Sequence, residues 1–87
     1  MNIETIWNNI KLHEGEIFRT VRGIEYSYVV IEDYILINND KKRRITKDSI
    51  ETAIAIKTPS PSKILKEGIW GPSYVYGIIT DERMVFA

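Results

Sequence analysis

The first apolar stripe lies close to the N-terminus. Large apolar residues recur there with the helical spacing i, i+3, i+4 and i+7, at Ile3, Ile6, Trp7 and Ile10. This spacing places four apolar side chains on one side of a helix. We therefore predict a helix over residues 3–12, with Asn2 as its N-cap and Gly15 just beyond its end.

The period changes between residues 15 and 45. Three short runs, EIFRTV, EYSYVVI and YILIN, are rich in β-branched and aromatic residues and are separated by the turn dipeptides RG and ED. Such runs predict an antiparallel meander of three strands. The middle run carries apolar side chains on both faces, so we expect protein to cover both. The run KRRI, residues 42–45, predicts a short fourth strand after the turn NNDK.

A second helix is predicted over residues 47–57. Thr46 fits its N-cap, and Ile45 and Ile50 have the spacing of a hydrophobic staple. The prolines of the following TPSPS segment end this helix, because a proline disfavours helical geometry in the residue before it.

The C-terminal segment admits two interpretations. A short helical turn is predicted over residues 62–68, and Pro72 fits the first position of another helix. That helix would bury Val75, Ile78 and Ile79. The alternative is a strand over residues 74–80, because this stretch is β-branched and aromatic and Gly77 is unfavourable inside a helix.

These elements predict an α+β fold in a single domain spanning residues 1–87. An N-terminal helix is followed by an antiparallel meander of three or four strands, then by a helix and a C-terminal helix or strand. The residues after the TPSPS segment are too few to form a core of their own, so the segment is an internal loop.

The composition excludes several classes of functional site. Twelve Lys and Arg balance twelve Asp and Glu, so no overall charge steers the chain toward polyanions or membranes. The absence of cysteine excludes disulfides and thiolate zinc sites. No apolar run approaches the roughly 18 residues of a membrane span, and the N-terminus lacks the pattern of a leader peptide. We expect a cytoplasmic protein without membrane contact, metal or cofactor.

A run of four basic residues, 41–44, raises the question of nucleic-acid binding. If this run is extended, Arg43 and Arg44 project to opposite faces. Our first hypothesis is a non-enzymatic module that contacts the nucleic-acid backbone through a basic turn and helix start. The predicted contacts are Lys42, Arg43, Arg44, Lys47, Arg19 and Arg22. The alternative interpretation of the run is a solvated strand end that pairs with nearby acids.

A second hypothesis belongs to another class, a protein–protein adaptor or small homodimer that uses a tyrosine- and isoleucine-rich sheet face. The candidate partner-binding residues are Tyr26, Tyr28 and Trp70. Tyrosine also packs well in half-buried sheets, so a structural role is the competing interpretation for each. A third hypothesis, a small regulator that binds and blocks a larger enzyme, is compatible with the sequence but has no specific residue in its support.

Catalytic chemistry is not predicted. His13, the single histidine, ends the first predicted helix, where the helix dipole favours it without any catalytic role. Asp33 and Asp40 lie at opposite ends of one predicted strand, roughly 15 Å apart, which is too far to share a metal ion.

The succession FRTVRGIEYSY, RRITKDSIETAI and GPSYVYGIITDERM resembles a small uncharacterised bacterial domain that stands alone or is appended to larger proteins, some of which handle DNA. The resemblance covers nearly the whole chain. It implies a compact module without an assigned reaction, in which residues 71–74 form a structural corner, and it favours a DNA-related role.

Overall fold

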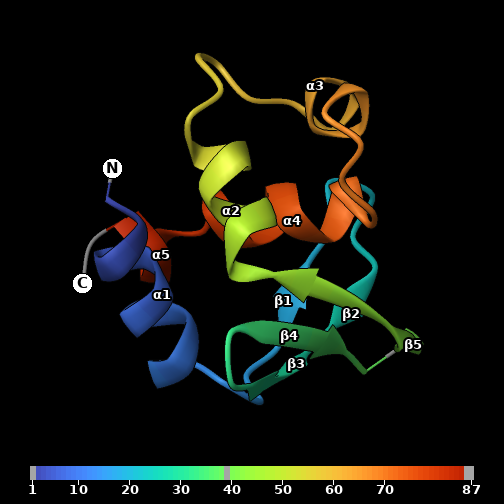
Figure 1. Ribbon diagram of the computed structural model, residues 1–87. Helices are drawn as coiled ribbons and strands as arrows, with labels where there is room; N and C mark the ends of the chain where they lie inside the picture. Colours follow the sequence, from blue (N-terminus) through green and yellow to red (C-terminus); the bar gives the residue numbers. More distant parts are fainter. Residues whose placement is uncertain (1, 39, 86–87) are drawn as a thin grey trace.

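The computed structural model describes residues 2–38 and 40–85, with side chains except at 40–42 and 85. It is an α+β domain, so the predicted fold class is confirmed (Figure 1). In chain order the elements are α1 (Ile3–Leu12), β1 (Phe18–Arg19), β2 (Glu25–Tyr26), β3 (Tyr28–Ile31), β4 (Tyr34–Ile37), β5 (Asp40–Thr46), α2 (Lys47–Ile54), α3 (Pro61–Lys66), α4 (Pro72–Ile79) and α5 (Glu82–Val85).

The strands form two antiparallel sheets where the sequence predicted one meander. One sheet pairs β1 with β2, and the other has the order β3-β4-β5. The middle predicted run breaks at Ser27, whose N–H donates to Asn38 Oδ1 at 2.8 Å and whose carbonyl accepts from Asn38 N at 2.9 Å. Asn38 directly follows β4, so these two bonds lie at the end of the β3–β4 pairing. The preceding strand, β2, pairs with β1. The predicted fourth strand is confirmed and is longer, as β5.

One face of the three-stranded sheet packs on the core. Tyr28 and Ile35 lie on this face, and the Tyr28 hydroxyl donates to Ile10 O of α1 at 2.6 Å. On the opposite face Val29 and Ile31 are exposed. The expectation that protein covers both faces of the middle run is therefore wrong within this chain, because the helices pack on one side of the sheet only.

Helix α4 lies at the centre of the molecule, between α2 and the β1–β2 hairpin (Figure 1). The helical interpretation of the C-terminal segment is confirmed and the strand alternative is wrong. Val75, Ile78 and Ile79 are buried as predicted. Gly77 has a packing reason, because a Cβ atom there would lie 2.6 Å from Tyr26 Oη and 3.0 Å from Arg19 O. Glycine thus lets the hairpin approach the helix closely.

The predicted helix caps are present. Asn2 Oδ1 accepts from the N–H groups of Glu4 and Thr5 at 2.7 and 3.3 Å. Thr46 Oγ1 accepts from Ser49 N at 3.1 Å. Helix α2 ends at Ile54, three residues earlier than predicted. Helix α3 begins slightly before the predicted turn, with Ser60 as its cap.

Helix α5 was not predicted from the sequence. It lies beside α1 (Figure 1), where the side-chain amide of Asn9 donates to Met84 O at 3.0 Å. Arg83 fastens the helix to the start of β1, because its guanidinium lies 3.7 Å from the centre of the Phe18 ring. The same group donates to Asp81 Oδ1 at 2.8 Å and to Glu16 Oε1 at 3.1 Å.

We expect acid to weaken this connection. The hydrogen bond from Arg83 holds the pKa of Asp81 below its ordinary value of 3.8. Hydrogen bonds from His13 and Arg83 hold the pKa of Glu16 below 4.5. A carboxyl group whose pKa is lowered by folding stabilises the fold above its ordinary pKa, and this contribution is lost as the pH falls through the lowered value. The free energy of unfolding should therefore fall below about pH 4.

Urea unfolding at a series of pH values measures this effect, with Asp81→Asn and Glu82→Gln as a pair of variants. Asp81→Asn keeps the hydrogen-bonding shape but not the charge, so its stability should fall less steeply in acid than that of the parent. Glu82 is exposed, and Glu82→Gln should follow the parent. Equal acid slopes in the parent and Asp81→Asn would contradict the role given to Asp81.

Candidate functional site

Two of the predicted phosphate contacts are held in ion pairs. Arg19 Nη2 lies 2.8 Å from Glu25 Oε2, and Lys47 Nζ lies 3.0 Å from Glu4 Oε1. Both pairs are at the surface, where an ion pair contributes little to stability. They nevertheless place a carboxylate beside each cation, which would repel an approaching phosphate.

The basic run itself divides between two surfaces. The guanidinium of Arg43 lies 5.6 Å from the ring centre of Trp70, whereas that of Arg44 lies 4.6 Å from the ring centre of Tyr34. The prediction that successive strand residues point to different faces is thus confirmed. The side chain of Lys42 lies outside the described part of the chain. The remaining predicted contact, Arg22, lies in the turn between β1 and β2.

Tyr26 and Tyr28 were wrongly predicted to bind a partner. Their side chains are 1% and 0% exposed, respectively. The Tyr26 hydroxyl donates to Tyr74 O at 2.8 Å, so both tyrosines hold core elements together. Burial raises the pKa of both hydroxyls. Trp70, the third candidate, is half-buried, and its ring lies 6.0 Å from that of Tyr74.

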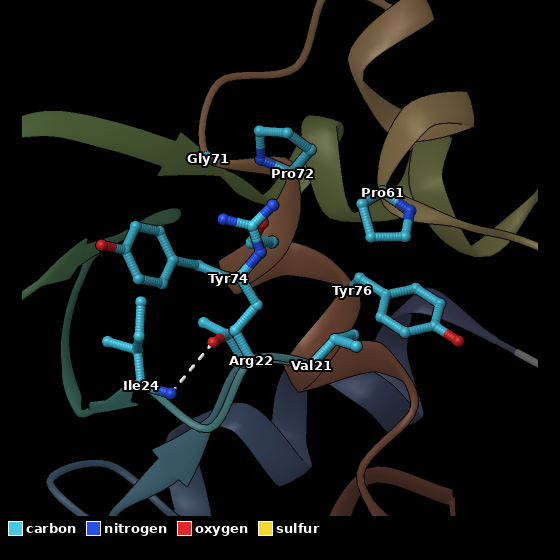
Figure 2. Close-up of a pocket in the computed structure, with 10 residues that line it drawn as sticks. Val21, Arg22, Ile24, Pro61, Gly71, Pro72, Tyr74 and Tyr76 are labelled. Atoms are coloured by element: carbon cyan, nitrogen blue, oxygen red, sulfur yellow. Dashed lines mark hydrogen bonds between the residues drawn. The ribbon is translucent and has the colours of Figure 1, made fainter.

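A groove of about 710 Å³ lies between the β1–β2 turn and the starts of α3 and α4 (Figure 2). Its volume is within the range of small ligand sites in proteins. The residues that line it are Thr20, Val21, Arg22, Ile24, Pro61, Gly71, Pro72, Ser73, Tyr74 and Tyr76.

Hydrogen bonds to Thr20 fix the hairpin wall of the groove. Thr20 N donates to Ile24 O at 3.0 Å and Thr20 O accepts from Gly23 N at 2.9 Å. Thr20 Oγ1 accepts from Ile24 N at 3.1 Å. Gly23 has φ +85°, which glycine adopts without strain. The turn is therefore well defined, and it presents Val21 with 73% of its surface exposed.

Prolines shape the opposite wall. Pro61 and Pro72 occupy the first turns of α3 and α4, where proline is pre-organised for the helix. Gly71 precedes Pro72 with φ +69°, so the chain turns sharply into α4. Residues 71–74, where the resemblance implied a structural corner, contain this turn and the first three residues of α4. Because prolines and a tightly bonded turn form both walls, the groove exists before any ligand arrives.

The sequence indicated only part of this site. Arg22 was predicted as a contact, but the groove itself was missed. Turn residues are usually polar, yet Val21 and Ile24 flank the RG dipeptide. Those two apolar residues were the available indication that something covers the turn.

The lining of the groove carries little charge. Among the described residues that line it, Arg22 is the only charged one, and the others offer hydroxyl groups and apolar surface. No group of three or more His, Asp or Glu residues suited to a metal ion occurs in the described part of the chain. Within the same residues, no helix has the length and apolar character needed to cross a membrane.

The outer face of the three-stranded sheet is the second apolar surface. Val29 and Ile31 are exposed there and neighbour Leu36 and Tyr34 across the strands. The free edge of β3 is capped, because Val30 N donates to Glu14 Oε2 at 2.7 Å and Gly15 N donates to Tyr28 O at 3.1 Å. These contacts occupy part of the β3 edge that a partner strand would use. The homodimer hypothesis concerns the sheet face, where Val29 and Ile31 remain exposed.

Comparison with protein-family models, curated proteins and solved structures found no match to this chain. The resemblance to a bacterial domain stays a prediction. Functional inference therefore depends on the geometry of the groove.

Proposed function

We propose that this domain is a non-enzymatic binding module, and that a segment of a partner protein binds in the groove. The exposed apolar rim carries this proposal. Val21 and Ile24 are both more than half exposed, although they lie in a well-bonded turn. Exposed apolar side chains beside a preformed hollow are typical of interaction sites.

The lining also supports binding without catalysis. General acid–base chemistry needs a titratable group that can exchange a proton near neutral pH. No histidine or carboxylate lies among the described lining residues, and a guanidinium stays protonated. Proline and tyrosine walls instead offer flat apolar surface with little conformational freedom to lose on binding.

A protein segment fits this groove better than a nucleic-acid backbone does. Binding to a nucleic-acid backbone draws much of its affinity from several phosphate contacts made by Lys and Arg. The groove contains one cation, while Arg19 and Lys47 lie in ion pairs and Arg44 lies over Tyr34. The net charge of zero adds no general attraction for polyanions.

Selection of random linear peptides displayed on phage tests the proposal. Peptides enriched on the parent protein should bind Val21→Ser about tenfold more weakly, because burial of a valine side chain contributes about 1.5 kcal/mol. Leu12→Ser is the matched control, since Leu12 is 74% exposed and lies on α1, outside the groove lining.

Equal affinity of the enriched peptides for the parent and both variants would place their site elsewhere and contradict the proposal. Fluorescent duplex and single-stranded oligonucleotides provide the competing measurement. Salt-sensitive oligonucleotide binding that Arg43→Ala/Arg44→Ala removes, together with no enriched peptide, would instead favour the nucleic-acid hypothesis.

A further inference from the structure

The charge in the lining of the groove is of one sign, positive. Arg22 is the only charged residue among the described lining residues, and no carboxylate lies among them. None of the ion pairs between described residues involves Arg22. The guanidinium of Arg43 lies 5.6 Å from the ring centre of Trp70, which neighbours the lining residue Tyr74, so this second cation near the groove has the same sign.

The position of Arg22 suits recognition of a ligand. Figure 2 shows its guanidinium extending from the hairpin turn toward Pro72, in the space between the Tyr74 and Tyr76 side chains. Its backbone is fixed by the hydrogen bonds that join Thr20 to Gly23 and Ile24. The turn therefore delivers the cation to the groove at little further cost in backbone order.

We propose that the groove selects acidic partner segments, in which an Asp or Glu carboxylate binds Arg22 while a neighbouring apolar residue packs against Val21, Ile24 and Pro61. This inference rests on the proposed function. A planar guanidinium can donate two parallel hydrogen bonds to one carboxylate, which gives geometric specificity as well as attraction. The apolar walls on either side of the cation require an apolar residue next to the acid.

A peptide carboxylate is favoured over a phosphate chain by the lining. A single cation satisfies one carboxylate, whereas a nucleic-acid strand would leave its other phosphates against proline and aliphatic surface. The mixture of one charge with several apolar contacts matches a short acidic and hydrophobic peptide.

The test is phage selection of random peptides on three proteins: the parent, Arg22→Glu and Lys11→Glu. Peptides from the parent should be enriched in Asp or Glu beside an aromatic or aliphatic residue. Peptides from Arg22→Glu should lose the acid and gain Lys or Arg. Lys11 is exposed on α1, outside the groove lining, so Lys11→Glu makes the same charge change and should give the parent's sequences.

A double-mutant cycle then measures the contact. Changing the conserved acid of a selected peptide to its amide should weaken binding to the parent about tenfold, because a charge-assisted hydrogen bond is lost. The same change should have no effect on Arg22→Gln.

The outcomes distinguish the selectivity for acidic segments from the proposed function, which is binding of a protein segment in the groove. If enriched peptides lack an acid, or keep it on Arg22→Glu, the inference fails while the proposed function stands. If no peptide is enriched on any of the three proteins, both fail. Oligonucleotide binding that depends on Arg22, with no enriched peptide, would assign the cation to phosphate instead and would also overturn the inference.

Discussion

Replacing Tyr28 with alanine is expected to lower the free energy of unfolding by about 3–5 kcal/mol, as for other large aromatic side chains in cores. Tyr28 is 0% exposed, its ring lies 5.4 Å from that of Phe18, and its hydroxyl bonds α1. A domain of this size is typically stable by only about 5–15 kcal/mol, so the change removes a large share. Urea unfolding followed by circular dichroism measures it.

Two further variants separate the contribution of the Tyr28 hydroxyl from that of its buried ring. Tyr28→Phe removes only the hydroxyl and should cost about 1 kcal/mol, because the Ile10 carbonyl loses its donor. Tyr34 lies on the outer sheet face and is half-buried, so Tyr34→Ala should cost clearly less than Tyr28→Ala. A loss below about 1 kcal/mol for Tyr28→Ala would mean that Tyr28 lies at the surface, where a partner could bind it.

Alanine at position 77 is expected to destabilise the protein by about 1–3 kcal/mol, although alanine is the better helix former by about 1 kcal/mol. The added methyl group would lie 2.6 Å from Tyr26 Oη and 3.0 Å from Arg19 O. Both neighbours belong to the β1–β2 hairpin, so the hairpin must move away from α4. Thermal or urea unfolding gives the size and sign of the change.

Tyr26→Phe provides the internal control for Gly77→Ala. Removing the Tyr26 oxygen relieves the closer of the two contacts, so Gly77→Ala should cost less in the Tyr26→Phe background than in the parent. If Gly77→Ala instead stabilises the protein, the gain in helix propensity exceeds the cost of packing. That result would contradict the close approach of the hairpin to α4.

Local features of the sequence correctly predicted the starts of α1, α2 and α4. The caps Asn2 and Thr46 and the apolar spacing of α1 depend on residues within one or two turns of each other, and all three were confirmed. Pro72 correctly indicated the start of α4, since a proline at the first helical position loses no hydrogen bond.

Features that depend on distant residues were not predicted. The division into two sheets depends on the bonding of Ser27 to Asn38, which neither residue type reveals alone. The burial of Tyr26 depends on Gly77, which is 51 positions away and was read from the sequence as a cost to the helix. Long-range packing thus changed a predicted binding residue into a core residue.

The groove was missed for the same reason. Its walls come from the β1–β2 turn and from the starts of α3 and α4, which are about 40–50 residues further along the chain. The sequence shows the basic run 41–44 as a block, whereas the fold separates Arg43 from Arg44 and leaves Arg22 in the hollow. Charge density along a chain is a poor guide when alternate strand residues face different surfaces.

Amide proton–nitrogen correlation spectra locate the binding surface, because they report binding at each residue. The protein is titrated with an acidic peptide enriched by phage selection and, separately, with a DNA duplex. We expect the peptide to shift the amide signals of residues 20–24 and 73–76, and the duplex to shift none. Shifts caused by the duplex at residues 43–47, with the groove signals unchanged by the peptide, would contradict this expectation.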